Sequence, residues 1–284
     1  MFDVAIIGSG PAGVSAAINL KILNKSFIWY SSRISSKKVE RSHLIKNYPA
    51  FPEISGEKLN EDFLKHAQSL GIEINEEVVT GVYETDGYFT LLVQDKSVEA
   101  KSVILCLGVE AIKPIEGEEE FLGRGVSYCA TCDGFLYKGK KIAVLITDKK
   151  FEHEAKFLCG LAEKTYLIPL YKGYEAPPDA EVILKAPKKL SGGMKIEKID
   201  FGSESIEVDG LFILRGAVTP KTLLRGLKVE DGHIAVNRNM ETNIDGIFAA
   251  GDCTGRPYQI AKAVGEGNIA AHSAVEYLDK KVKA

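Results

Sequence analysis

One short stretch near the N-terminus constrains the fold more than any other part of the sequence. Residues 3–7 (DVAII) predict a buried strand, residues 8–13 (GSGPAG) follow it directly, and residues 14–23, rich in Ala, Ile and Leu, predict a helix. A strand, a G-x-G-x-x-G turn and a helix in this order are typical of a dinucleotide-binding βαβ unit. The sequence therefore predicts a parallel α/β sheet that binds a nucleotide at its first turn.

The glycines of this turn have different tasks. Gly8 permits the tight turn, Gly10 allows the backbone to approach a pyrophosphate, and Gly13 allows the helix and strand to pack closely. The N–H groups of the first helical turn would point at the phosphates. The candidate nucleotide-binding residues are Gly8, Ser9, Gly10, Pro11, Ala12 and Gly13. The alternative is a turn that needs three glycines for structural reasons alone.

The end of the second predicted strand departs from the usual pattern. In dinucleotide-binding units an acidic residue commonly follows this strand and bonds the ribose. Residues 27–30 (FIWY) predict the strand, and Ser31 follows it. A hydroxyl can still donate and accept hydrogen bonds, so Ser31 is the candidate for the ribose contact.

A second motif lies in the middle of the chain, where Cys129-Ala-Thr-Cys132 is followed by Asp133. A zinc site needs about four ligands, and the other three cysteines are scattered singly along the chain. A pair of inert core cysteines is a second alternative. The C-x-x-C spacing favours a redox-active dithiol, because the two sulfurs can close a small disulfide ring. Asp133 would then be the general acid toward the leaving thiolate.

A third motif precedes the predicted C-terminal helix. Residues 242–250 lead a strand into Gly251-Asp252, and residues 259–278 predict a long helix with small residues on its early turns. An Asp at the carboxyl end of a strand lies in the crevice where open sheets bind ligands, and it can bond a sugar-like hydroxyl. The alternative is that Asp252 only caps the following segment.

Composition excludes several classes of protein. The 284 residues predict about two domains. Lys plus Arg number 36 and Asp plus Glu number 39, so the net charge of −3 provides no basic field for nucleic acid or an anionic membrane. No apolar run reaches the roughly 18 residues of a membrane-spanning helix, and we expect no signal peptide because Met1 leads almost directly into the first strand. Five cysteines do not form a disulfide scaffold, which favours the cytoplasm.

Taken in order, these motifs resemble those of the low-molecular-weight thioredoxin reductases. The matching segments are residues 8–13, 47–49 (NYP), 123–134 (GRGVSYCATCDG) and 246–252 (GIFAAGD). The resemblance implies an α/β fold of two Rossmann-like three-layer domains, the second inserted into the first. We expect an FAD-binding domain over residues 1–111 and 239–284 and a redox-disulfide domain over residues 112–238. Members of this family also form homodimers.

The resemblance further implies roles for single residues. Asn47 and Gln259 would lie by the isoalloxazine, and Asp252 would hold the ribityl chain. Cys132 would be the sulfur nearest the flavin, and Cys129 would attack the disulfide of thioredoxin. The remaining candidate FAD-binding positions are Ser31, Lys38, Val78, Gly108, Gly251 and Ile260. No metal site is expected.

The second domain departs from the family pattern. Residues 140–146 predict the first strand of a second dinucleotide unit, but no glycine occurs between Ile146 and Gly160. Asp148, Glu152 and Glu154 place negative charge at the expected helix start, where it repels a phosphate. After the next strand, residues 170–173 (LYKG) offer one lysine where the family has arginines. We therefore predict that NADPH is not the electron donor; the alternative is a divergent site that binds NADPH weakly.

Within the family the sequence most resembles the ferredoxin-dependent flavin thioredoxin reductases, which lack NADPH motifs. We expect electrons to pass from reduced ferredoxin through FAD to the Cys129–Cys132 disulfide and on to thioredoxin. Another flavoprotein is an alternative donor. Two different functions stay open: an NAD(P)H-dependent thioredoxin reductase with an atypical nucleotide site, and a flavoprotein redox sensor or interaction module. Ferredoxins are typically acidic, so Lys185, Lys188, Lys189 and Arg215 are candidates for a basic docking face.

Overall fold

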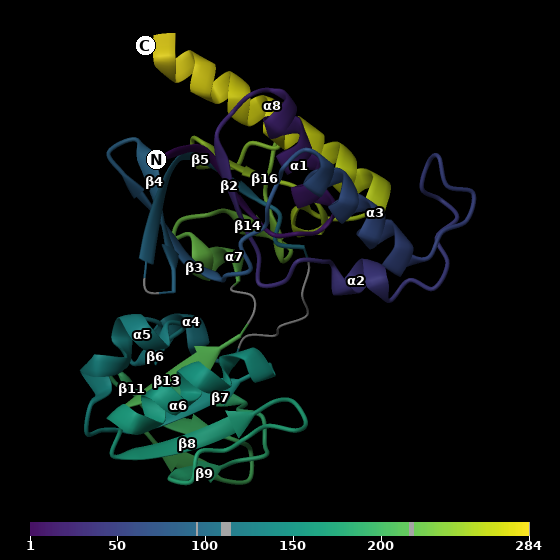
Figure 1. Cartoon of the computed structure of the whole chain (residues 1–284). Helices are drawn as coiled ribbons and strands as arrows, with labels where there is room; N and C mark the ends of the chain where they lie inside the picture. Colours follow the sequence, from purple (N-terminus) through teal and green to yellow (C-terminus); the bar gives the residue numbers. More distant parts are fainter. Residues whose placement is uncertain (95, 109–114, 216–218, 284) are drawn as a thin grey trace. The chain divides into compact units, whose positions relative to one another are not determined.

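The chain folds into two compact units, one inserted into the other. The computed structural model describes residues 1–94, 96–108, 115–215 and 219–283. The first unit comprises Met1–Ala111 and Pro220–Ala284, and the second comprises Ile112–Thr219 (Figure 1). The expected start of the inserted domain at residue 112 lies outside the described residues. The α/β class and the inserted arrangement agree with the prediction.

The first unit is built on a mixed six-stranded sheet. Its elements are β1 (Phe2–Ile7), α1 (Pro11–Ile22), β2 (Phe27–Tyr30), α2 (Lys37–Glu40), α3 (Gly56–Ser69), β3 (Val79–Thr85), β4 (Tyr88–Val93), β5 (Lys96–Leu105), α7 (Pro220–Leu223), β14 (Val229–Glu230), β15 (His233–Ile234), β16 (Ile247–Ala249), the 3₁₀ turn η3 (Asp252–Thr254) and α8 (Ile260–Lys283). The strand order is β2-β1-β5-β4-β3, with β16 also paired to β5. Strands β1, β2, β5 and β16 run parallel, whereas β3 and β4 are antiparallel.

Strand β5 connects the two parts of this sheet. Its first half pairs with β4, from Lys96 to Ala100, and its second half pairs with β16, from Val103 to Leu105. The carboxyl ends of β1, β5 and β16 therefore lie at one edge of the sheet. Ligands of open parallel sheets bind at this edge.

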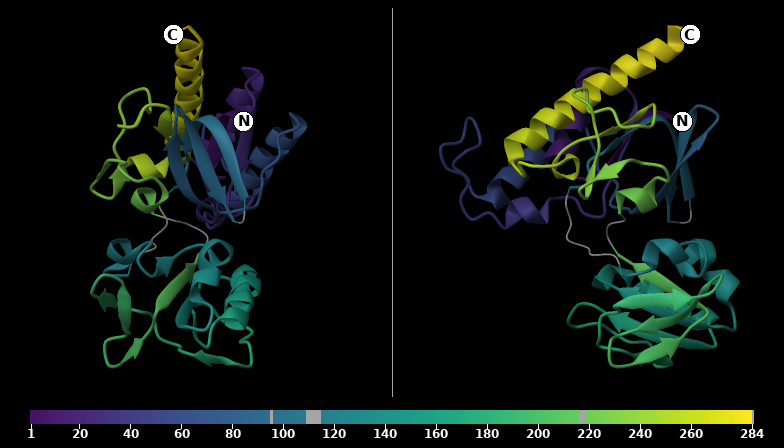
Figure 2. Two further views of the ribbon diagram at one scale, coloured as in Figure 1. Left: turned by 90° about the vertical axis from the view of Figure 1, so that its left-hand side faces the viewer. Right: turned by 180° about the vertical axis from the view of Figure 1, so that it is seen from behind.

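Helices α1 and α8 pack side by side against one face of the sheet (Figure 2). Val4 and Ile6 of β1 contribute to this core, which also contains the alanines of both helices. The helices approach closely because Gly267 faces Ala12: a Cβ on Gly267 would lie 2.2 Å from the Ala12 carbonyl oxygen. In the described part of the chain, no helix has both the length and the apolar surface to cross a bilayer.

The second unit has a parallel five-stranded sheet and a small antiparallel one. Its elements are α4 (Glu118–Phe121), β6 (Val126–Ser127), α5 (Ala130–Asp133), η1 (Gly134–Tyr137), β7 (Lys141–Ile146), η2 (Lys149–Phe151), α6 (Glu152–Leu161), β8 (Lys164–Pro169), β9 (Ala180–Val182), β10 (Lys189–Gly192), β11 (Ile196–Asp200), β12 (Ser205–Glu207) and β13 (Gly210–Leu214). The parallel order is β6-β13-β7-β8-β9, and β10-β11-β12 form the antiparallel sheet.

The parallel sheet of the second unit lies between two other layers, the antiparallel sheet on one face and α6 on the other. Ala143 and Leu145 of β7 belong to one cluster with Ile196 and Ile199 of the antiparallel sheet. Side chains alternate along a strand, so the intervening residues of β7 face the opposite side, which α6 covers. The parallel sheet is therefore buried on both faces, as α/β proteins require.

The expected return to the first domain at residue 239 is wrong, because the units divide after Thr219. Helix α7 packs on β3 of the first unit. Asn243 binds the segment that follows α7 to the rest of the first unit. Its side chain accepts a hydrogen bond from the Lys228 N–H (2.8 Å) and donates one to the Gly226 carbonyl (2.9 Å). These elements are only two to four residues long and have no hydrophobic period, so the sequence offered little to locate the crossing.

Candidate functional site

The turn between β1 and α1 has the form of a pyrophosphate cradle. Gly8 has φ +116°, and a Cβ there would lie 2.1 Å from the Cys106 carbonyl oxygen. A Cβ on Gly13 would lie 2.0 Å from the Gly8 carbonyl oxygen. Gly10, in contrast, has nothing within 4 Å of its Cβ position. Two glycines are thus required by the fold itself, and Gly10 leaves room for a ligand.

The start of α1 lacks a side-chain cap. Gly10 is its N-cap residue and Pro11 its first residue, and no side chain accepts a hydrogen bond at the N-cap. The first N–H groups of a helix are unsatisfied within it and carry the positive end of its dipole. A phosphate fits this position both sterically and electrostatically.

Ser31 follows β2 and contacts the glycine turn directly. Its hydroxyl donates to the Ser9 hydroxyl (2.9 Å), which in turn donates to the Arg33 carbonyl (2.5 Å). Both serines are almost fully buried. This chain of hydroxyls fixes the segment after β2 to the glycine turn, where a ribose contact is predicted.

The loop after β16 brings the third motif to the same place. Gly251 has φ +92°, and a Cβ there would lie 3.0 Å from the Cβ of Ala12 at the start of α1. Asp252 follows with a side chain that is 14% exposed and paired with Lys38. Three segments far apart in the sequence therefore converge: the glycine turn, α2 and the Gly251–Asp252 loop.

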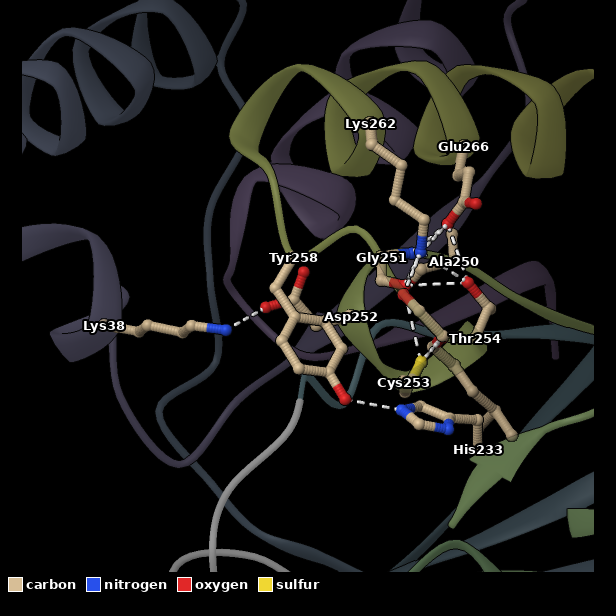
Figure 3. A network of polar contacts seen from close by, with 12 residues as sticks. Lys38, His233, Ala250, Gly251, Asp252, Cys253, Thr254, Tyr258, Lys262 and Glu266 are labelled. Atoms are coloured by element: carbon tan, nitrogen blue, oxygen red, sulfur yellow. Dashed lines mark hydrogen bonds and ion pairs between the residues drawn. The ribbon is translucent and has the colours of Figure 1, made fainter. Parts of the chain in front are cut away.

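Lys262 and Glu266 of α8 reach this loop with their side chains (Figure 3). The Lys262 ammonium donates to the carbonyl oxygens of Gly251 (2.7 Å) and Gly255 (2.8 Å) and to the Thr254 hydroxyl (2.9 Å). Glu266 accepts from the Gly251 N–H (2.9 Å) and lies 2.8 Å from the Thr254 hydroxyl. The two charged groups also pair with each other at 3.0 Å.

An aromatic residue flanks the Asp252 side of the loop. The Lys38 ammonium lies 4.5 Å from the centre of the Tyr258 ring, and the Arg256 guanidinium lies 5.4 Å from it. The Tyr258 hydroxyl contacts His233 Nε2 at 2.6 Å (Figure 3). Lys38 thus belongs to an ordered polar group beside Asp252.

The other predicted FAD-binding residues are placed as follows. Asn47 and Gln259 are brought together, the Asn47 amide donating to Gln259 Oε1 at 2.8 Å. Gly108 follows β5 with φ +68°. Ile260 begins α8 and packs against the buried cluster of Val39, Ile45, Ile54 and Leu59. Val78 directly precedes β3.

The thiol of Cys253 links two of these segments. It lies by the backbone of Leu107 and Gly108 and bonds the Ala250 carbonyl (3.3 Å). Burial raises the pKa of Cys253 to about 11 and raises the pKa of the neighbouring Cys106 well above its usual range. Both thiols are therefore protonated, which fits a packing role.

The second unit carries the redox pair. Cys129 and Cys132 form a disulfide, and the Cys132 N–H donates to Cys129 Sγ at 3.1 Å. The Ser127 hydroxyl donates to Asp133 Oδ2 (2.7 Å) and accepts from the Cys129 N–H (3.1 Å). One buried serine therefore connects the acid candidate to the cysteine turn. Cys132 is exposed and Cys129 is half-buried.

Arg215 does not belong to a basic surface, contrary to the prediction. Its side chain is 3% exposed and is paired with Glu118, which is 1% exposed. The Tyr128 hydroxyl donates to the same Glu118 oxygen, and the Ile115 N–H donates to the other at 3.0 Å. Lys185 and Lys189 of the predicted face also pair with carboxylates, Glu204 and Glu116 respectively. Buried charges persist only when paired, and sequence composition does not reveal which charges are buried.

The turn after β7 differs from the turn after β1. The Asp148 side chain accepts a hydrogen bond from the Lys150 N–H (3.4 Å), and Glu152 begins α6. Glu152 Oε1 accepts from the Tyr171 hydroxyl (2.6 Å) and the Glu175 N–H (3.0 Å). The Tyr171 hydrogen bond lowers the pKa of Glu152, so this carboxylate stays negative. A negative charge lies where a second pyrophosphate would bind.

Comparisons with known proteins agree with this architecture. The family model of the pyridine nucleotide-disulphide oxidoreductases matches residues 2–147 and 181–267. The thioredoxin reductase of Listeria monocytogenes is 31% identical over 303 residues, which cover 99% of this chain and 95% of the relative. The chain belongs to the thioredoxin reductase family.

Two further relatives of this reductase cover its full length. The thioredoxin reductase of Bacillus subtilis is 32% identical and spans 99% of this chain and 96% of its own. A crystal structure described as a ferredoxin-flavin thioredoxin reductase, from Clostridium acetobutylicum, is 45% identical with a TM-score of 0.89, covering 100% of this chain and 99% of that one.

The reductase is a flavoprotein whose cofactor is FAD. The first unit fits this cofactor, because Gly10 leaves open space at an uncapped helix start and the Asp252 loop lies against the same turn. In the described residues, no group of three or more His, Cys, Asp or Glu side chains is placed to hold a metal ion.

Several residues that organise the site were missed from the sequence. Lys262 and Glu266 stand four residues apart on α8, as do many exposed pairs such as Lys280 and Glu276. Their spacing predicts a helix-surface ion pair. The loop packed against α8 distinguishes the buried pair from the exposed one, and residue spacing on the helix does not reveal that packing.

Proposed function

We propose that this reductase transfers electrons from reduced ferredoxin through FAD to the Cys129–Cys132 disulfide, and from the resulting dithiol to thioredoxin. The observation that carries the choice of donor is the turn after β7, where Glu152 bonds Tyr171 and Glu175. In a nicotinamide site this turn would have to receive a pyrophosphate.

Three features of that turn oppose a nucleotide. Every residue from 147 to 159 carries a side chain, whereas a pyrophosphate would need glycine there so that the backbone could approach it closely. The Glu152 carboxylate at the start of α6 opposes a phosphate at that helix end. The Glu152–Tyr171–Glu175 hydrogen bonds also fasten the segment after β8, where the adenosine half would lie, to the start of α6. The turn after β1 has none of these obstacles.

The relatives support ferredoxin as the donor. The Clostridium acetobutylicum structure, described as a ferredoxin-flavin thioredoxin reductase, is 45% identical over the full chain. The reduction potentials also favour ferredoxin. A ferredoxin with a potential near about −400 mV and a thioredoxin with one near about −270 mV would release roughly 6 kcal/mol when two electrons pass between them. Bound FAD supplies the conversion between single electrons and the electron pair that a disulfide needs.

The second unit supplies the groups for disulfide exchange. Exposed Cys132 is the sulfur that would receive electrons, and Cys129 would attack the thioredoxin disulfide once reduced. Asp133 would donate a proton to the departing thiolate, held in place by the Ser127 hydroxyl. Such exchange breaks one disulfide as it forms another, through a mixed disulfide.

A coupled assay tests this function. Thioredoxin-dependent reduction of insulin is measured under anaerobic conditions with reduced ferredoxin, and separately with NADPH. We expect turnover with ferredoxin and none above background with NADPH. Cys132→Ser should abolish turnover, whereas Cys159→Ser, which removes an isolated half-buried thiol, should retain it. Turnover with NADPH alone would favour the divergent nucleotide site, and no turnover with either donor would favour a redox sensor.

The proposal includes a homodimer in the cytoplasm. The dimer rests on the family resemblance, and the location rests on the sparse use of cysteine outside the redox pair. Light scattering on the purified holoprotein tests the dimer: the 31.0 kDa chain should give about twice that mass in solution.

A further inference from the structure

The loop that carries Asp252 is short and held by few contacts of its own. It consists of a single 3₁₀ turn between Gly251 (φ +92°) and Gly255 (φ +124°). Its internal backbone hydrogen bonds are those from the Thr254 N–H to the Gly251 carbonyl and from the Gly255 N–H to the Asp252 carbonyl. Such a turn needs outside support to present a side chain in one orientation.

Lys262 supplies part of that support. An ammonium group has three donors, and Lys262 directs hydrogen bonds to Gly251, Thr254 and Gly255, at both ends of the loop. The Glu266 carboxylate accepts a hydrogen bond from the Gly251 N–H, and its Oε2 lies 3.0 Å from Lys262 Nζ, where it compensates the charge of the lysine. Together the two side chains bind the whole loop to α8.

Burial separates this pair from the other ion pairs on the same helix. The side chains of Lys262 and Glu266 are each 17% exposed, whereas those of Lys280 and Glu276 are 72% and 66% exposed. Removing charges from water is unfavourable unless they gain good hydrogen bonds. The loop provides those bonds, so the pair and the loop depend on each other.

The loop presents Asp252 on the side away from this pair. Figure 3 shows Lys262 and Glu266 reaching the loop from α8, with Asp252 directed toward Lys38 of α2. Gly251 at the same time rests against Ala12 at the start of α1. A shift of the loop would therefore move Asp252 relative to the glycine turn.

We propose that Lys262 and Glu266 are positioning residues for FAD: they hold the Gly251–Gly255 loop so that Asp252 meets the cofactor bound at the glycine turn. Neither residue contacts the flavin; both act through the loop. The inference rests on the proposed function, in which FAD carries the electrons, and on the family resemblance, which implies that Asp252 contacts this cofactor.

The test compares FAD retention in Lys262→Met, Glu266→Gln and the matched control Lys280→Met, which removes an exposed lysine from an i,i+4 pair on the same helix. Each holoprotein is diluted, and the released FAD is measured by its fluorescence. We expect FAD to bind roughly tenfold more weakly in both loop-support variants, the size of effect typical for a residue that orients a ligand. Lys280→Met should bind FAD like the parent protein.

A second pair of measurements separates positioning from general stability. Trp29 is the only tryptophan and lies in the first unit, so its fluorescence follows unfolding there. Lys262→Met leaves Glu266 without its partner, so the FAD-free variant should unfold at a modestly lower temperature than the FAD-free parent protein. The holoprotein of the variant should lose more stability than that, because its FAD is also bound more weakly, and the visible circular dichroism of the flavin it retains should change. If Lys262→Met lowers the unfolding temperature of the FAD-free protein as much as it lowers that of the holoprotein, each compared with the parent protein in the same state, the role of Lys262 is structural and the inference is wrong.

Asp252→Asn distinguishes the possible failures. If Asp252→Asn weakens FAD binding but Lys262→Met does not, the positioning role is refuted and the proposed site stands. If Asp252→Asn binds FAD normally, the assignment of Asp252 is wrong and the inference fails with it.

Discussion

At the scale of single residues, the three glycines of the first turn are subject to different constraints. Gly8 and Gly13 face backbone carbonyl oxygens at 2.1 and 2.0 Å from their Cβ positions. Gly10 has φ −70° and open space around it. The fold therefore requires two of the glycines, whereas nothing packed around the third requires it to lack a side chain.

Gly10→Ala should separate folding from cofactor binding. We expect the FAD-free variant to unfold within about 1 kcal/mol of the parent protein, since its φ and surroundings accept a methyl group. FAD binding should fall sharply, because the methyl group occupies the space that the pyrophosphate needs. Urea unfolding and FAD titration are the measurements. Gly13→Ala is the control and should destabilise the FAD-free protein; normal FAD binding by Gly10→Ala would contradict the account.

Asp3 gives a pH dependence that belongs to the first strand. Burial alone would raise the pKa of Asp3, but hydrogen bonds from Lys101 and Ser26 outweigh it and lower the pKa to about 2. The folded pKa lies below the unfolded value of about 3.9, so the charged carboxylate stabilises the fold above that pH. This stabilisation should be lost as the pH falls from about 4 toward about 2.

The measurement is urea unfolding of the parent protein and Asp3→Asn, followed by Trp29 fluorescence at several pH values. Asp3→Asn should be less stable than the parent protein at pH 7, and the difference should shrink progressively below about pH 4. A difference that stays constant down to the acid limit would show that the Asp3 carboxylate contributes no charge-dependent stability.

At the scale of elements, the clearest difference lies between two turns built on the same βα plan. Residues 8–10 connect β1 to α1 with two glycines, whereas residues 147–151 connect β7 to α6 with none and include an extra 3₁₀ turn. The second turn is hydrogen-bonded to neighbouring segments. The Thr147 N–H donates to the Leu214 carbonyl, and the Tyr171 hydroxyl donates to the Glu152 carboxylate. The same βα plan thus has an open, uncapped glycine turn in one unit and a hydrogen-bonded acidic turn in the other.

Arg215 and Glu118 form an almost fully buried ion pair in the second unit. Removing one partner leaves the other charge buried and uncompensated, so Arg215→Met should cost about 3–5 kcal/mol of the stability of this unit. The double variant Arg215→Met/Glu118→Leu should recover most of that loss. Far-ultraviolet circular dichroism reports both units and Trp29 only the first, so the two can be followed separately. A double variant as unstable as the single one would refute this assignment.

Sequence alone predicted the elements whose signals are local. The strand at 27–30 coincides with β2, and the strand and turn at residues 3–13 match β1 and the start of α1, because glycine spacing and hydrophobic runs act over a few residues. The return crossing and the burial of Arg215 were predicted wrongly. Both depend on contacts between distant segments, such as Asn243 with Gly226 and Arg215 with Glu118. No local pattern distinguishes a buried arginine from an exposed one.

At the scale of the whole molecule, the two units divide the chemistry. The first unit has the glycine turn and the loop bound to α8 between which we propose that FAD lies, and the second carries the disulfide with its serine and aspartate. The nucleotide fold is retained in the second unit, but its turn after β7 carries acidic residues and lacks glycine. Electrons would then have to enter through a donor that needs no nucleotide site.

Anaerobic titration of the oxidised holoprotein with each electron donor shows whether the flavin is reduced through a nicotinamide or through ferredoxin. The visible absorbance of the flavin is followed during addition of NADPH, NADH and reduced ferredoxin in parallel. The account predicts that reduced ferredoxin bleaches the flavin and that neither nicotinamide does so at stoichiometric amounts. Rapid bleaching by NADPH would contradict it.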